Sequence, residues 1–167
     1  MTFSSKAEYG VRLMVELGRQ EGERPTSLKA IAEAEDLPLS YLEHVVASLK
    51  RAGLVESSRG AHGGYRLARL PAEIAMDEVV LALEGSIAPM ECFTDAPPGK
   101  VACSHHGEES NACSTKLLWM RVQMGIVTAL QRTTLAELVE FSRCGVDTAL
   151  DREAEGVTSL PVVQAGS

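Results

Sequence analysis

The chain has 167 residues, is 45% hydrophobic and has a mean hydropathy of +0.00, which excludes a largely disordered protein and allows one domain with a helical extension. Its net charge of -7 argues against a general nucleic-acid binder. Because no apolar run could span a membrane and residues 1–18 lack the pattern of a secretory signal, we expect a cytoplasmic protein without a membrane partner.

Three helices are predicted in the first third of the chain. Residues 5–20 place apolar side chains at helical spacing, and Ser5 with Glu8 fits the Ser-x-x-Glu capping box. A short second helix is predicted over 27–34, and a connector leads from it into a third helix over 41–53. Two helices joined by a short turn, the second ending in basic residues, are typical of a helix-turn-helix.

The hydrophobic period changes after the third helix. LVESSRGAHGGYRLAR, residues 54–69, predicts strand, turn and strand, with three glycines in the turn. A hairpin that directly follows a helix-turn-helix is a wing. Residues 1–70 are therefore predicted to form a winged helix-turn-helix DNA-binding domain.

A long helix is predicted further along the chain, beyond a short one over 76–84 that ends at Gly85. Residues 114–131 are helical in period, but their apolar positions cover more than one side. Such a helix needs cover from several directions, and a partner subunit is the simplest cover. We therefore expect a mainly α homodimer with a small β-hairpin wing and a long dimerisation helix.

The rest of the chain is assigned by composition. Residues 71–141 are predicted to hold the cysteine-rich loop and the dimerisation helices, the last of which covers 133–141. Residues 142–167 are predicted to form a disordered tail, polar and with Gly and Pro from about residue 145 onward.

The charge is distributed unevenly. Residues 1–70 carry 10 Lys and Arg against 9 Asp and Glu, or +1, whereas the remainder carries 6 against 14, or -8. Only the front part could meet phosphate, provided that its basic residues gather on one face.

Cys92, Cys103 and Cys113 lie in one loop, residues 90–115. Clustered cysteines in a reducing compartment indicate metal or redox chemistry, and thiolates suit both iron–sulfur clusters and zinc. The spacing lacks the close Cys-x-x-Cys pairs of a zinc ribbon. The fourth cysteine, Cys144, is expected beyond the final helix as an incidental thiol.

Several stretches together resemble a known family. They are SSKAEYGVRLMVEL, LSYLEHVVASLKRAGLV, RGAHGGYRLAR, DEVVLALEG, the three-cysteine loop, and LLW followed by TTLAELV. This set is similar to the IscR–NsrR family of bacterial winged-helix repressors that bind iron–sulfur clusters, and the similarity runs from residue 1 to about 141. It implies a transcriptional regulator, a repressor by type, that senses iron–sulfur status or oxidative or nitrosative stress.

The resemblance also implies a cluster held by Cys92, Cys103 and Cys113, with 4Fe–4S favoured over 2Fe–2S. The cysteines of the family usually stand closer together than the ten and nine intervening residues found here, which leaves the cluster type open.

Three cysteines leave one position of a four-ligand cluster open. The histidine that IscR-like members place three residues after the last cysteine is Lys116 here. The acidic residue that NsrR-like members donate from the first helix of the other subunit corresponds to Glu8. His105 or His106 within the loop is one alternative, and a solvent or small-molecule ligand is another. The capping box with Ser5 would explain Glu8 without any metal.

The recognition helix and the wing supply the candidate DNA contacts. Side chains in the first turn of a recognition helix reach base edges, and a wing arginine can enter a narrow minor groove. Glycines in the wing would let its backbone approach DNA closely. Ser40 and Glu43 also match a capping pair, which is compatible with base contact. The predicted DNA-binding residues are Ser40, Tyr41, Glu43, His44, Arg59, Gly60, His62 and Gly63.

Two other functions fit the same pattern. One is a winged-helix regulator with zinc held by three cysteines and a histidine, and the other is a redox protein whose winged helix contacts proteins. The sequence offers no nucleophile–base pair and no phosphate-binding loop, so we expect neither an enzyme nor a small-molecule substrate.

Overall fold

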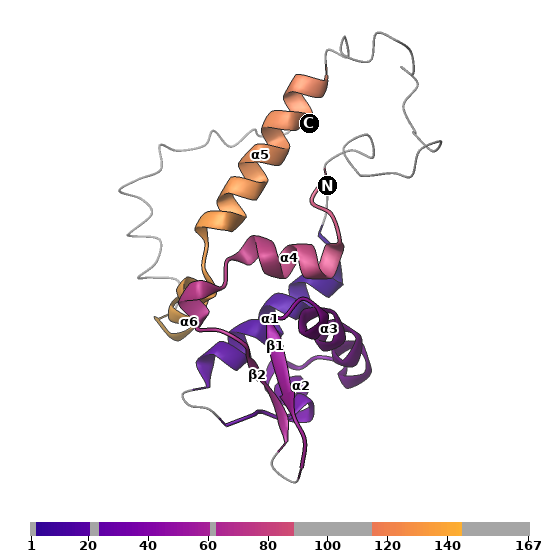
Figure 1. The fold of residues 1–167 in the computed structure, drawn as a ribbon, viewed down its shortest axis with the longest axis vertical. Coiled ribbons are helices and arrows are strands. Elements are labelled where there is room, and N and C mark those ends of the chain that lie inside the picture. Colours follow the sequence, from indigo (N-terminus) through magenta and orange to yellow (C-terminus); the bar gives the residue numbers. More distant parts are fainter. Residues whose placement is uncertain (1–2, 21–23, 61–62, 89–114, 145–167) are drawn as a thin grey trace, which may run out of the picture.

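The computed structural model describes residues 3–20, 24–60, 63–88 and 115–144. Its elements are α1 (Ser5–Arg19), α2 (Leu28–Glu35), α3 (Leu39–Arg51), β1 (Val55–Ser58), β2 (Gly64–Leu67), the 3-10 helix η1 (Pro71–Glu73), α4 (Met76–Glu84), α5 (Lys116–Arg132) and α6 (Leu135–Cys144). Helices α1 to α4 and the hairpin form one body, from which α5 extends (Figure 1). The predicted class, mainly α with a small hairpin wing, is confirmed.

Helix α1 lies at the centre of the core and contacts α2, α3, α4, α6 and β2. Leu13 and Met14 on α1 are fully buried. One continuous cluster of buried side chains joins them to the other helices; it includes Ile31, Leu42, Val45, Leu49, Leu54, Val55, Ile74, Val79, Leu83, Leu135 and Val139. The winged helix and the helices that follow it therefore share a single core.

Two glycines let α1 approach its neighbours closely. A Cβ added at Gly10 would collide with Leu83 of α4, and one added at Gly18 would lie 2.6 Å from Val139 Cγ2 of α6. Since Val139 is β-branched and has few rotamers, it cannot move aside easily. The absence of side chains at Gly10 and Gly18 thus lets α4 and α6 lie close to the backbone of α1.

The wing is an antiparallel hairpin in which Val55 pairs with Leu67 and Ser58 with Gly64. Thr26 adds an isolated bridge to Tyr65, with hydrogen bonds of 2.9 Å from Thr26 N to Tyr65 O and 2.8 Å from Tyr65 N to Thr26 O. A Cβ at Gly64 would collide with the backbone carbonyl of Thr26. Gly64 is therefore required by packing within the chain.

The two predicted capping pairs are wrong. Helix α1 begins one residue after Ser4, and the Ser4 hydroxyl donates to Glu84 Oε1 of α4 at 2.6 Å instead of capping its own helix. Ser5, the predicted cap, therefore lies inside α1. Helix α3 follows Pro38, so Ser40 is likewise inside the helix and cannot cap it. In both cases the helix starts earlier than the local pattern indicated.

Helix α4 and the described helices after it lie close to their predicted ranges. Helix α4 ends at Glu84, and Gly85 adopts a positive φ of 79° there. Helix α6 is longer than predicted and includes Cys144 as its last residue, so that cysteine does not lie beyond the helix. Residues 142–144 of the predicted tail are helical, as the end of α6, whereas residues 145–167, like residues 89–114, lie outside the described parts of the chain.

The wing is tied to α4 by an ion pair. Arg69, just after β2, donates from Nη2 to Glu78 Oε2 of α4 at 2.6 Å. This hydrogen bond holds the pKa of Glu78 below its usual range and raises the pKa of Arg69.

Helix α5 packs on α4. None of its residues is buried, and Leu117, Leu118, Met120, Val122 and Met124 are exposed. Among the described helices none is long and apolar enough to cross a membrane.

We expect Gly64→Ala to destabilise the protein by about 1–3 kcal/mol, because a methyl group there forces the Thr26 backbone away from β2. Chemical denaturation measures the change. Ser58→Ala, at the exposed position directly opposite on β1, is the matched control and is expected to stay within about 0.5 kcal/mol of the unaltered protein. Equal stability of the two variants would contradict this account of Gly64.

Candidate DNA-binding surface

One face of α3 is open to solvent while the opposite face is buried. Leu42, Val45, Val46 and Leu49 are buried. Ser40, Glu43 and His44 are all exposed, and their spacing places them on one side of the helix. This is the arrangement that a recognition helix needs, with its core face fixed and its outer face available.

Tyr41 differs from the other predicted contact residues. Its ring is half-buried and packs edge-on against Tyr9 of α1, with ring centroids 5.4 Å apart and planes at 80°. Such a pair stabilises the α1–α3 packing. Tyr41 therefore has a packing role in the fold.

The wing presents Arg59 at the end of β1, where it is exposed. Gly60 follows with a φ of 113°, a conformation that strongly favours glycine, and its carbonyl accepts a 2.9 Å hydrogen bond from Gly63 N. A Cβ at Gly63 would lie 2.5 Å from the Ser58 carbonyl. These glycines are thus explained by the tight turn itself; His62 lies outside the described residues.

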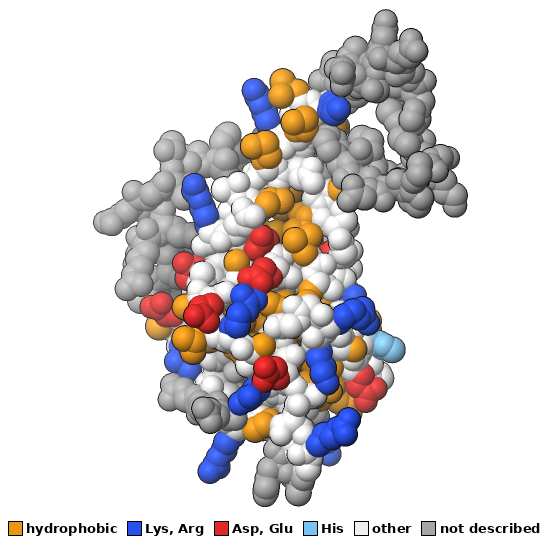
Figure 2. Space-filling model, viewed as in Figure 1, with side chains coloured by type: hydrophobic (Ala, Val, Ile, Leu, Met, Phe, Trp, Pro, Cys, Tyr) orange, Lys and Arg blue, Asp and Glu red, His pale blue; other side chains and the backbone are white. Residues whose placement is uncertain are grey.

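Contacts between α3 and the wing hold the two candidate DNA-contacting elements together. Lys50 Nζ donates to Ser57 Oγ of β1 at 2.5 Å. Across the hairpin, Arg66 Nη2 pairs with Glu56 Oε2 at 2.9 Å. Basic side chains lie along the side of the body that carries α3 and the wing (Figure 2).

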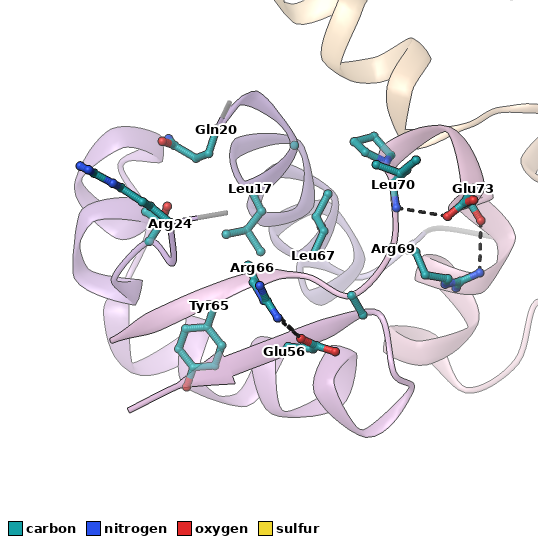
Figure 3. A pocket seen from close by; sticks show the side chains of 14 residues that line it. Leu17, Gln20, Arg24, Glu56, Tyr65, Arg66, Leu67, Arg69, Leu70 and Glu73 are labelled. Carbon is teal, nitrogen blue, oxygen red and sulfur yellow. Dashed lines mark hydrogen bonds and ion pairs between the residues drawn. The ribbon is translucent and has the colours of Figure 1, made fainter. Parts of the chain in front are cut away.

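A groove of about 620 Å³ runs between the end of α1 and β2. Leu17 and Leu67 line its floor, and the Arg66–Glu56 pair lies on one side (Figure 3). Arg69 on the same wall donates to the Glu73 carbonyl at 3.2 Å. These charges are engaged with one another, so the groove is best described as the seam where the wing joins α1.

Of the predicted metal ligands, only Glu8 lies within the described residues. Cys92, Cys103, Cys113, His105 and His106 lie outside the described residues. Glu8 lies in the first turn of α1 and is exposed. Within the described ranges no group of three or more His, Cys, Asp or Glu side chains could hold a metal ion.

Glu8 nevertheless lies in the part of α1 that packs against the end of α4. The backbone N of Ser4 donates to Glu84 Oε1 at 2.9 Å, and Lys6 Nζ donates to the Leu83 carbonyl at 2.8 Å. These bonds fix the N-terminal end of α1 against the C-terminal end of α4. Helix α4 therefore ends beside the helix turn that carries Glu8.

Comparison with known proteins agrees with this architecture. Residues 3–141 match the model of the Rrf2 family, described as an iron-dependent transcriptional regulator. The chain belongs to the Rrf2 family. It is 38% identical over 142 residues to the transcriptional regulator CymR of Bacillus subtilis, covering 85% of this chain and 92% of that one. It is 35% identical over 139 residues to IscR of Aliivibrio salmonicida, covering 83% and 77%.

Solved structures of Rrf2-type regulators share the fold. The structure of CymR, the global cysteine regulator of B. subtilis, has a TM-score of 0.67 at 37% identity and covers 84% of this chain and 98% of its own. IscR of T. potens has a TM-score of 0.62 at 33% identity, with 95% and 93% covered. The family confirms the predicted resemblance, the role as a transcriptional regulator and the absence of an enzymatic role.

Two residues on this surface were missed from sequence. Leu39 opens α3 and is 39% exposed, so it is available for apolar contact with a thymine methyl group. Lys50, one of the basic residues at the end of the third predicted helix, joins α3 to β1. Placing the start of α3 two residues too late hid Leu39, and no local pattern reports the Lys50 contact.

We expect Arg59→Ala to weaken binding to a DNA duplex, selected from random sequence by the unaltered protein, by about 10-fold, because an exposed wing guanidinium is lost. Fluorescence anisotropy at several salt concentrations measures the affinity. Arg132→Ala, on α5, removes the same charge away from the wing and is expected to leave the affinity unchanged. An equal loss in both variants would show that only net charge matters.

Proposed function

We propose that this Rrf2-family protein is a homodimeric regulator whose operator binding depends on an iron–sulfur cluster held by Cys92, Cys103 and Cys113. The observation that carries the proposal is the presence of three thiols in residues 92–113, in a chain whose family is described as iron-dependent. Three thiolates are a donor set that fits such a cluster. When bound, the cluster supplies a redox-sensitive and oxidant-sensitive group.

CymR is described as a global cysteine regulator, whereas other relatives are named IscR. The thiol-rich stretch of this chain favours iron–sulfur chemistry as its own signal. We take the cluster to be of the 4Fe–4S type.

Glu8 is the proposed fourth ligand. With the Ser5 capping box absent, the fold gives this exposed carboxylate no capping role. No hydrogen bond or ion pair engages the Glu8 side chain within the described ranges. A carboxylate is a hard ligand that binds iron more weakly than a thiolate does, so it is suited to reversible release. Its release would act directly on α1, which packs against α3.

The dimer interface is proposed on α5. Leu117, Met120 and Met124 share one strip by helical spacing, and Leu118 and Val122 share another. Met124 is 64% exposed and Leu117 57%. Apolar side chains gather along this helix in Figure 2. A second copy, packing its own α5 here, would cover what the described part of the chain leaves open.

We expect Met124→Glu to raise the dimer dissociation constant by at least about 100-fold, because an unpaired charge in an apolar interface is strongly unfavourable. Sedimentation velocity measures the association. Leu70→Glu adds the same charge at an apolar side chain outside α5 that is 67% exposed, so it is the matched control and is expected to remain dimeric. A monomeric unaltered protein would contradict the dimer proposal outright.

Anaerobically purified protein is expected to be brown, with about four irons and four sulfides per chain by chemical assay and Mössbauer spectroscopy. Cys92→Ala, Cys103→Ala and Cys113→Ala should each lose most of the iron. Cys144→Ala is the matched control and should keep all of it, because Cys144 belongs to α6. Glu8→Ala should keep the cluster under anaerobic conditions but lose it faster in air.

Colourless protein with one tightly bound zinc per chain would contradict the cluster and favour zinc. Iron content that is equally reduced in the Cys144 variant would contradict the assignment of the three ligands.

A further inference from the structure

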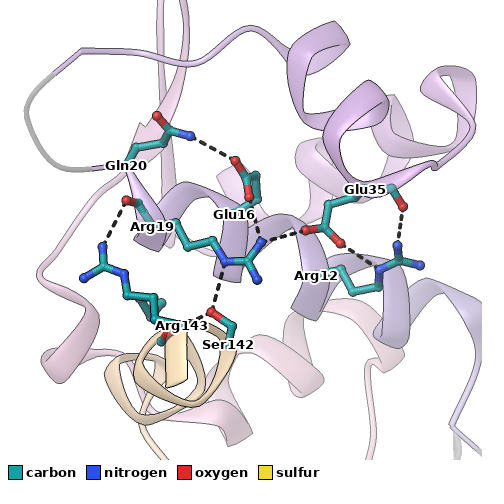
Figure 4. Close-up of polar contacts among 8 residues, drawn as sticks. Arg12, Glu16, Arg19, Gln20, Glu35, Ser142 and Arg143 are labelled. Carbon is teal, nitrogen blue, oxygen red and sulfur yellow. Dashed lines mark hydrogen bonds and ion pairs between the residues drawn. The ribbon is translucent and has the colours of Figure 1, made fainter. Parts of the chain in front are cut away.

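A polar network joins α6, α1 and the end of α2 (Figure 4). Arg19, the last residue of α1, donates from Nε to Ser142 Oγ of α6 at 3.0 Å and from Nη1 to Glu35 Oε1 of α2 at 3.3 Å. Arg12 donates from Nε to Glu35 Oε2 at 2.9 Å and from Nη2 to the Glu35 backbone carbonyl. One carboxylate thus holds two guanidinium groups, and one of these groups also contacts α6.

A hydrogen bond within α6 orients the Ser142 hydroxyl in this network. The Ser142 hydroxyl donates to the Val139 carbonyl at 2.7 Å, which leaves its oxygen free to accept from Arg19. Arg143 Nη2 donates to the backbone carbonyl of Arg19 at 3.1 Å. The Glu35 side chain is only 14% exposed, so solvent screens its ion pairs less than those of a surface pair.

Glu35 occupies the position that sets the start of α3. It is the last residue of α2, and Asp36 follows with a left-handed φ of 50°. Leu37 is buried and Pro38 precedes the first turn of α3. Because Arg12 holds both the side chain and the carbonyl of Glu35, the two arginines fix the turn from which the recognition helix begins.

We propose that Arg19 and Glu35 are positioning residues that relay the position of α6 to the recognition helix α3. The relay rests on the proposed function, in which α5 packs against a second copy and α6 follows α5 directly. A shift of α6 withdraws Ser142 from Arg19. The Arg19 guanidinium then loses one of its fixed acceptors. Its contact with Glu35 changes as a result, and so does the turn before α3.

A double-mutant cycle on the full-length protein tests the relay. Affinity for a DNA duplex selected from random sequence by the unaltered protein is measured for Ser142→Ala, Glu35→Gln and the double variant. We expect about 3-fold weaker binding for Ser142→Ala and about 10-fold for Glu35→Gln. The double variant should bind no more weakly than Glu35→Gln, because the serine acts through the carboxylate.

Matched controls separate positioning from simple stability. Glu33→Gln removes a carboxylate from the same helix that pairs with exposed Lys29 at 3.7 Å, and it should leave affinity unchanged. Ser142→Thr keeps the hydroxyl and should restore binding. Amide hydrogen exchange at residues 36–42 should rise in Ser142→Ala, although Ser142 lies on another helix, and this readout remains available if Glu35→Gln fails to fold.

The possible failures are distinct. If the unaltered protein selects no duplex, the proposed function and the relay are both wrong. If it binds DNA but the two substitutions act independently, or Ser142→Ala changes neither affinity nor exchange at residues 36–42, the relay alone is wrong.

Discussion

The close packing of α1 against both α4 and α6 is the constraint on which the rest of the structure depends. Gly10 and Gly18 remove side chains at the two crossing points, so that Leu83 and Val139 fill the space directly above the α1 backbone. Interiors packed in this way transmit displacement, because neighbouring side chains have no free volume to absorb it. Helix α4 precedes the cysteine-containing stretch and α5–α6 follow it. Both ends of that stretch are therefore coupled mechanically to the helix that supports the winged head.

The DNA-reading surface is built as a unit with α1. Tyr41 packs on Tyr9, Lys50 ties α3 to β1, and the Thr26–Tyr65 bridge anchors β2 to the segment that leads into α2. Independent motion of the wing or of α3 would break several of these contacts at once. A signal that changes operator affinity is thus more easily delivered by reorienting the two heads of the proposed dimer, or by altering the turn before α3, than by loosening either reading element.

Periodicity and turn chemistry predicted the elements well, since these features are local. The buried stripe of α3, the hairpin and the end of α4 at Gly85 all follow from spacing within a few residues. The capping pairs failed because Ser4 is satisfied by Glu84, which lies 80 positions away, and a local pattern contains no information about such a partner. The Arg19–Ser142 contact spans 123 positions, and in the sequence each of its members is indistinguishable from a solvated surface residue. The cysteine chemistry, in contrast, rests on residue type and on the family resemblance, and Cys92, Cys103 and Cys113 lie outside the described residues.

The anchoring of α1 also indicates what cluster loss would do. Glu84 accepts both the backbone N and the hydroxyl of Ser4, so a carboxylate already lies at the N-terminal end of α1, where the helix dipole favours negative charge. Lys6 adds a second tie to α4 through the Leu83 carbonyl. Helix α1 therefore has its own stabilising contacts and does not need Glu8 to be held by a metal in order to stay folded. Release of Glu8 from a cluster would accordingly change where α1 lies relative to the partner subunit and leave its secondary structure intact. That is the behaviour of a two-state regulator and differs from metal-dependent folding, in which removal of the metal unfolds the domain.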